Sequence, residues 1–207
     1  MPDSLKKYSS VFVIIVLVTA ILVLVGWQFG IEIFKRPLSN LVAMNPMTAV
    51  AFAFSSGSLL LLNKQRKTRY ILAGKILALL VLMIGTAKLT GIIIGYDSGI
   101  DLWLYYGKLS GEITKHVLNS MAPNTAASFI LAGLSLLFLN YQKGNHQPAH
   151  YSAFVITVIS LLSILGYIYQ VPEFHGVLKS FPMAVHSAFV FCFFHWLFYL
   201  FILKKGS

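Results

Sequence analysis

Residues 9–27 read SSVFVIIVLVTAILVLVGW, and this stretch decides the class of fold. It contains no charged side chain, and a helix of about 20 apolar residues is what crosses the roughly 30 Å hydrocarbon core of a bilayer. Lys6 and Lys7 precede it, as basic residues precede the apolar part of a signal peptide. That part is usually only about 7–15 residues long and ends at a small-residue cleavage site, which is not evident here. We therefore interpret the stretch as a retained membrane span.

The composition of the whole chain is that of a membrane protein. Of its 207 residues, 57% are hydrophobic and only 11% are charged, whereas a soluble domain carries about 25% charged residues. Six apolar runs predict an all-α membrane domain over residues 1–207, with transmembrane helices at 8–30, 44–63, 70–95, 121–142, 151–170 and 183–203. These helices are predicted to form three hairpins, at residues 8–63, 70–142 and 151–203, with tight connections from one hairpin to the next.

Charged residues set the predicted orientation. The net charge of +10 does not indicate a nucleic-acid partner, because the basic residues lie in loop clusters and not on one soluble face. One set of loops carries nine cationic residues and Asp3; the alternate loops carry five cationic and five acidic residues. Because loops rich in Lys and Arg stay on the cytoplasmic side, both termini are predicted to be cytoplasmic. The longer outer loops, with their Trp and Tyr, are predicted to form short interfacial helices.

A motif repeats at the outer end of every second predicted helix. The pattern Met-x-x-x-[Thr/Ser]-Ala-x-x-Phe begins at Met44, Met121 and Met183. Residues four apart drift only about 40° around a helix, so Met, Thr or Ser, and Phe form one stripe. The small Ala permits close helix approach, and Pro46 and Pro123 suit a first helical turn. Two interpretations stay open: the stripe is a packing device, or three stripes meet on a pseudo-threefold axis and line an outward-facing pocket.

The pocket hypothesis names specific residues. The position before the hydroxyl differs between repeats, and such asymmetry can make a pocket specific for a small amphiphilic ligand. A titratable histidine there can make binding pH-dependent. The candidate ligand-binding residues are Asn124, His186, Thr125, Ser187, Thr48, Met47 and Lys88.

Lys88 has two possible roles. It lies seven residues before Gly95, within the third predicted span, and a charge at that depth is costly unless it reaches a polar partner or the membrane surface. The side chain either extends to the lipid headgroups or points into the bundle and pairs with Asp97, Asp101 or an acidic ligand. Asp97 and Asp101, with Gly99 between them, either shape a turn or help to bind a cation.

The chain offers little to a metal or an enzyme mechanism. Cys192 is the single cysteine, so an internal disulfide or a thiolate metal site is not expected. His186 and His195 lie on opposite faces of one helix, so haem would need His116, His175 or another helix for its second axial ligand. His195 is either a buried, hydrogen-bonded histidine or part of a haem or quinone site. No catalytic set is recognisable, which disfavours an intramembrane enzyme.

Several blocks resemble a known family. They are NPMTAVAF at 45–52, GYDSGID at 95–101, MAPNTA at 121–126, LGYIYQVP at 165–172 and FPMAVHSA at 181–188. In order and spacing they resemble the N-terminal membrane sensor region of bacterial sensor histidine kinases and diguanylate cyclases. The resemblance implies location in the bacterial inner membrane and a cytoplasmic PAS, kinase or cyclase output module that follows this region. Lys88 departs from it, because an acidic residue is expected there.

The leading hypothesis is a sensory input domain without catalytic activity of its own. Its expected partners are the lipid bilayer and a second copy of the chain in a homodimer. The alternative is a small transporter or channel built from three hairpins. A transporter would favour inverted repeats and helices broken at the midplane, whereas these repeats all run in the same direction.

The loop charges generate a topology prediction. Single cysteines placed at Gln65 and at Ser98 should react with impermeant thiol reagents from opposite sides of the membrane, Ser98 from the periplasm. Reaction of both from one side would contradict either the number of spans or the orientation.

Overall fold

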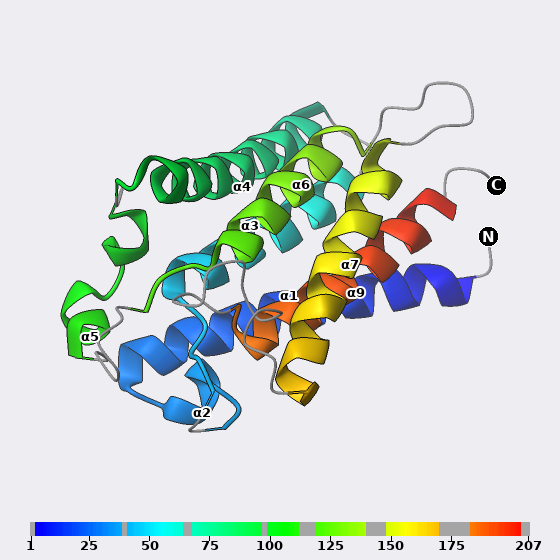
Figure 1. Ribbon diagram of the computed structural model, residues 1–207. Coiled ribbons are helices and arrows are strands. Elements are labelled where there is room, and N and C mark those ends of the chain that lie inside the picture. Colours follow the sequence, from blue (N-terminus) through cyan, green and yellow to red (C-terminus); the bar gives the residue numbers. More distant parts are fainter. Residues whose placement is uncertain are drawn as a thin grey trace.

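The computed structural model describes residues 3–38, 41–63, 68–96, 99–111, 119–139, 148–169 and 183–203. The described chain is all-helical, and its elements are shown in Figure 1. They are α1 (Asp3–Phe29), α2 (Glu32–Lys35), α3 (Pro46–Asn63), α4 (Thr68–Ile94), the 3₁₀ turn η1 (Ile100–Leu102), α5 (Tyr106–Gly111), α6 (Pro123–Leu137), α7 (Pro148–Tyr169) and α9 (Val185–Leu203).

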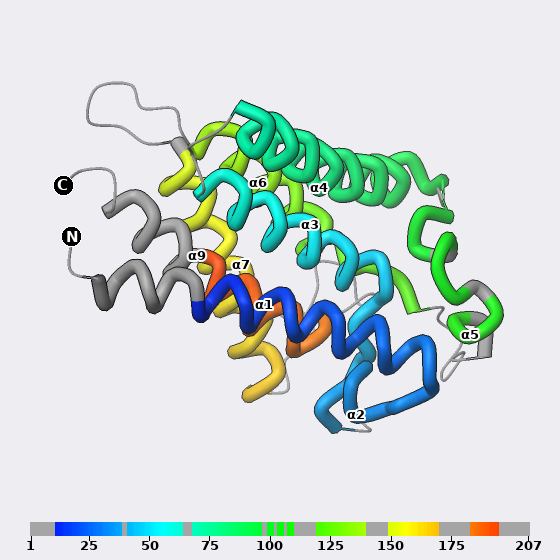
Figure 2. Tube along the Cα trace, turned by 180° about the vertical axis from the view of Figure 1, so that it is seen from behind, coloured from blue at the N-terminus to red at the C-terminus, as the bar shows by residue number. Residues whose placement is uncertain are grey.

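The long helices form one bundle with two distinct ends. Helix α1 begins and α9 finishes at the same end, which we call the terminal end (Figure 1). The short elements α2, η1 and α5 lie at the opposite end, which we call the loop end (Figures 1 and 2). The predicted short helices in the outer loops are therefore present, as α2 and α5.

Three helices occupy the centre and three surround them. Helix α3 packs against α6, and aromatic side chains of α3, α6 and α9 meet in the core. Each outer helix packs against two inner ones: α1 against α3 and α9, α4 against α3 and α6, and α7 against α6 and α9. Every outer helix thus covers the groove between two inner helices.

Burial follows this division. In the apolar windows of the helices, 61% of residues are buried in α3, against 33% in α1 and 28% in both α4 and α7. The outer helices instead expose large apolar side chains, such as Ile14, Val18 and Ile21 on α1, Leu72, Ile76 and Leu79 on α4, and Phe154, Val158 and Leu161 on α7. Such continuous apolar faces are unfavourable in water and suit contact with lipid.

Within the described ranges, four helices are long and apolar enough to cross a membrane: α1, α3, α4 and α7. These four helices indicate a membrane protein. Helix α6 has 15 residues, so it is about 22 Å long and shorter than the predicted span at 121–142. It begins at Pro123, whose missing N–H suits the first turn. At its end, Leu139 N–H donates to Leu136 O, three residues earlier, which closes a tighter turn than that of an α-helix. Helix α9 has 19 residues, so it is about 28 Å long.

Glycine lets α4 and α6 approach closely. A Cβ atom on Gly85 of α4 would lie 2.8 Å from Ala126 O, and one on Gly133 of α6 would lie 2.8 Å from Leu82 Cβ. Real Cβ atoms do not make such contacts, so the backbones meet only because both side chains are absent. Small residues are the usual means of close packing between helices in membranes.

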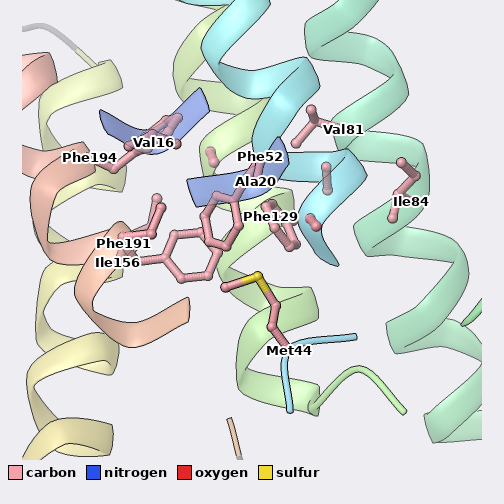
Figure 3. Close-up of a cluster of buried hydrophobic side chains, with 14 of the residues drawn as sticks. Val16, Ala20, Met44, Phe52, Val81, Ile84, Phe129, Ile156, Phe191 and Phe194 are labelled. Carbon is pink, nitrogen blue, oxygen red and sulfur yellow. The ribbon is translucent and has the colours of Figure 1, made fainter. Parts of the chain in front are cut away.

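The motif phenylalanines meet at the centre of the bundle. The ring centroids of Phe52 and Phe129 are 4.9 Å apart, those of Phe52 and Phe191 4.7 Å, and those of Phe129 and Phe191 5.0 Å. All three rings are fully buried, and the Met44 side chain lies beside them (Figure 3). Tilted and edge-to-face pairs at this distance are favourable beyond the area that they bury. The three motif stripes therefore converge at the level of these rings, which we call the Phe triad.

The Phe triad generates a stability prediction. Replacement of Phe52, Phe129 or Phe191 by Ala should lower the free energy of unfolding by about 3–5 kcal/mol, because each change leaves a cavity in a close-packed centre. Phe154→Ala is the matched control, since this side chain is 57% exposed on α7. Thermal denaturation in one detergent measures all four variants. Equal melting temperatures for the triad variants and the control would contradict a central role for the rings.

Candidate functional site

The candidate site lies at the loop end, where the motif begins. The three motif methionines and the three motif alanines are fully buried, like the phenylalanines. The first helical bonds are equivalent in the three inner helices: the N–H groups of Ala49, Ala126 and Ala188 donate to the carbonyls four residues earlier. In α3, Asn45 also caps the helix, because its Oδ1 accepts the Met47 N–H at 2.8 Å.

Each outer helix reaches across to the motif of its hairpin partner. Trp27 Nε1 of α1 donates to Met44 O at 2.9 Å, and the Tyr167 hydroxyl of α7 donates to Met183 O at 2.7 Å. Lys88 Nζ of α4 donates to Ser120 Oγ, next to Met121, at 2.6 Å. We call these three hydrogen bonds the latches. They use an indole, a phenol and an ammonium group for one structural task.

The latch of the second hairpin is a buried ion pair. Lys88 Nζ contacts Asp101 Oδ2, and the side chains of Lys88 and Asp101 are only 7% and 3% exposed. Asp101 Oδ2 also accepts hydrogen bonds from Ser120 Oγ at 2.7 Å and from Met121 N at 3.3 Å. Of the two predicted roles for Lys88, the structure shows pairing with Asp101 inside the bundle. Lys75, at the other end of α4, is exposed.

One carboxylate oxygen of Asp101, Oδ1, can still accept a hydrogen bond. Its Oδ1 atom is buried and has no hydrogen-bond partner within the described part of the chain. An unsatisfied buried oxygen is costly, and a carboxylate can accept several hydrogen bonds. This oxygen can therefore accept a donor from water or from a small polar molecule.

A second cluster supports the Trp27 latch. Lys35 Nζ lies 4.6 Å from the centre of the Trp27 ring and donates to Glu32 Oε1 at 2.7 Å. Arg36 Nε lies 3.1 Å from Glu32 Oε2. The hydrogen bond from Lys35 is the main cause that holds the pKa of Glu32 below its ordinary value. A backbone hydrogen bond joins this cluster to the Trp27 latch, because Met44 N–H donates to Lys35 O at 2.9 Å.

Residues 99–111 cross the loop end and hold two helices; we call this segment the strap. At one end, Asp101 binds Lys88 of α4. At the other, Lys108 Nζ donates to Trp27 O at 2.9 Å and to Gln28 O, and the Tyr105 hydroxyl donates to Leu24 O at 3.4 Å. These carbonyls close the last turns of α1, where a cation is favourable.

The strap bends at an unusual residue. Tyr105 has a φ of +59°, in the left-handed region that residues other than glycine rarely adopt. This conformation joins η1, which packs on α3 and α4, to the part of the strap that reaches α1. Leu109 is fully buried behind it.

The predicted pocket residues other than Lys88 differ in their surroundings. Asn124 is buried, and its Nδ2 donates to Ser163 Oγ of α7 at 3.1 Å. Thr48, Thr125 and Ser187 are fully buried one helical turn before the Phe triad, which places them near the axis. Met47 is buried as well. His186 is half-buried, and its Nδ1 has no hydrogen-bond partner among the described residues. Whether these residues share a ligand cavity stays a prediction.

Other candidates lie outside what the structure describes. They are Asp97, His116 and His175, together with the side chain of His195. Among the described residues, no three His, Cys, Asp or Glu side chains are grouped as for a metal ion. The haem and quinone hypotheses therefore stay predictions, and Cys192 is a free, half-buried thiol.

Sequence reasoning missed Trp27, Tyr167, Ser163 and Lys108. A signal was present for the first two, because Gly26-Trp27 and Gly166-Tyr167 stand at nearly equal distances before Met44 and Met183. In the second hairpin the long outer loop separates Lys88 from Met121, which hides the correspondence. Nothing in the sequence indicates that Lys108 reaches the end of α1.

Comparison with protein-family models, with curated proteins and with solved structures found no match. The functional assignment therefore rests on the geometry of this chain and on the motif blocks.

The buried ion pair generates a prediction. Lys88→Met should destabilise the protein by about 3–5 kcal/mol, because Asp101 is then left buried and uncompensated. Asp101→Asn should also destabilise it, and the double variant should lose less than the sum of the single losses, because the two residues interact directly. Thermal denaturation measures the effects.

Lys75→Met is the matched control on the same helix and should change stability by less than about 0.5 kcal/mol. Additive losses for Lys88→Met and Asp101→Asn would show that the two side chains do not interact.

Proposed function

We propose that this chain is a membrane sensory input domain, built from three hairpins with six spans and with both termini in the cytoplasm of a bacterium. In this arrangement the strap and the latches lie on the periplasmic side of the inner membrane. The domain passes its signal to a cytoplasmic PAS, kinase or cyclase module. It does not itself catalyse a reaction.

The helix packing supports six spans. Helices α6 and α9 lie at the centre together with α3. Each packs beside two outer helices that are long enough to cross a bilayer. A helix shorter than the hydrocarbon core can still span it, because the bilayer thins locally around it. The predominance of basic residues in the loops at the terminal end supports the cytoplasmic position of that end.

The centre of the bundle favours a sensor over a transporter or a channel. A conduit along the axis would have to pass the Phe triad, whose ring centroids lie 4.7–5.0 Å apart. No room for water or a solute exists between rings in contact at this distance. The described helices are also continuous through this level.

The observation that carries the proposal is the contact of Lys88 with Asp101. A charge within a span is expensive and marks a functional position. The contact of Lys88 with Asp101 joins α4 to the strap. In the proposed topology the strap lies outside the spans, and α4 runs from the strap towards the terminal end. A ligand or a change at the outer surface that competes for Asp101 would free Lys88. The freed ammonium group would then shift α4 against α3 and α6.

Two measurements test the proposal: the sequence of the parent gene and the output activity of the full-length protein. The reading frame should continue beyond residue 207 into a PAS, kinase or cyclase module. In the full-length protein in membrane vesicles, Lys88→Met should then change autophosphorylation or cyclic dinucleotide synthesis several-fold. Lys75→Met, the exposed control on α4, should leave that activity unchanged.

Two results would refute the proposal. One is a gene that encodes no signalling module after this region. The other is an output activity that is the same in the parent protein, in Lys88→Met and in Lys75→Met. Uptake of a solute by proteoliposomes of the purified chain would instead favour the transporter.

A further inference from the structure

The loop end carries an exposed apolar surface beside the strap. Ile93, Ile94 and Tyr96, at the end of α4 and just beyond it, are 76%, 72% and 70% exposed, and Trp103 of the strap is 78% exposed. We call these four residues the outer patch. It continues the exposed apolar face of α4, which includes Leu79 and Met83. Because that face suits lipid, the patch extends the same contact beyond the hydrocarbon-spanning part of the helix.

The length of α4 fixes the depth of the outer patch. Its 27 residues make a helix about 40 Å long, whereas the hydrocarbon core is about 30 Å thick. The basic and aromatic residues Arg69 and Tyr70 mark the terminal end. If these side chains lie at one membrane surface, the last turn of α4 lies in the headgroup layer of the opposite surface. Tyr and Trp are enriched in that layer because their rings are both apolar and polar.

The charges of the strap do not oppose this placement. Lys108 donates to the carbonyls at the end of α1, and Asp101 is buried against Lys88. The anion is thus buried and the cation is paired with backbone carbonyls, while Trp103, between them in the sequence, is left exposed. A segment whose charged groups are paired within the protein and whose indole is exposed suits the boundary between headgroups and acyl chains.

We propose that the strap rests in the headgroup layer of the outer leaflet, with Trp103 and the rest of the outer patch in direct contact with lipid. This inference depends on the proposed topology, and it names the bilayer surface as the partner of the strap. A change in leaflet thickness or lipid packing then displaces Trp103. The displacement reaches α4 through Asp101 and α1 through Lys108.

Tryptophan fluorescence tests the contact. The purified chain and its Trp103→Phe variant are placed in phosphatidylcholine vesicles, and the difference between their emissions isolates Trp103 from Trp27 and Trp196. The conservative change at a highly exposed position keeps the fold intact, which circular dichroism checks. Quenching is measured with lipids brominated near the headgroup, with lipids brominated deep in the acyl chains, and with aqueous iodide.

The expected result is strong quenching of the Trp103 emission by the shallow bromines, weaker quenching by the deep bromines, and little by iodide. Strong quenching by iodide with none by either lipid would place Trp103 in water and overturn the inference. Protection from all three quenchers would also overturn it, because another protein surface would then cover the patch. The cysteine labelling at Gln65 and Ser98 tests the topology separately, so the two failures are distinguishable.

Discussion

The Phe triad is the contact on which the rest of the bundle depends. One ring from each inner helix meets the other two within 5.0 Å, so α3, α6 and α9 have one relative rotation and one relative depth. The hydrophobic effect does not draw helices together within lipid, so such association relies on close packing. Once the inner helices are fixed, the three grooves between them are the available positions for α1, α4 and α7.

The latches explain how the outer helices are held at the correct depth. A lipid-facing helix can slide along a groove of apolar side chains with little change in contact area. A hydrogen bond from its end to the first turn of the neighbouring inner helix removes that freedom. Trp27 and Tyr167 bond to a backbone carbonyl of the motif methionine itself. Lys88 instead bonds to a side chain, and its charge requires Asp101 from the strap. Helix α4 is therefore the outer helix whose described latch depends on the strap.

The sequence predicted the helical class, because its apolar runs are as long as membrane-spanning helices. Four of the predicted spans are confirmed as helices long enough to cross a membrane. The stripe of Met44, Thr48 and Phe52, repeated in the other hairpins, indicated which face of each inner helix is buried. Periodicity carries no information about contacts between distant loops, so Lys108 at the end of α1 was not predicted. For Lys88 the sequence left two roles open, because depth alone does not say which way a long flexible side chain turns.

The described contacts differ between the α3/α4, α6/α7 and α9/α1 seams. At the α3/α4 seam, Ser58 Oγ donates to Gly74 O at 2.8 Å, and at the α6/α7 seam the equivalent Ser135 Oγ donates to Ala149 O at 3.3 Å. At the α9/α1 seam, the described contacts include a stacked pair of rings, Phe12 and Phe193. Apolar contacts resist sliding less than directed hydrogen bonds do, because they are non-directional. The described contacts at the α3/α4 and α6/α7 seams are therefore directed, whereas the ring pair at the α9/α1 seam is not.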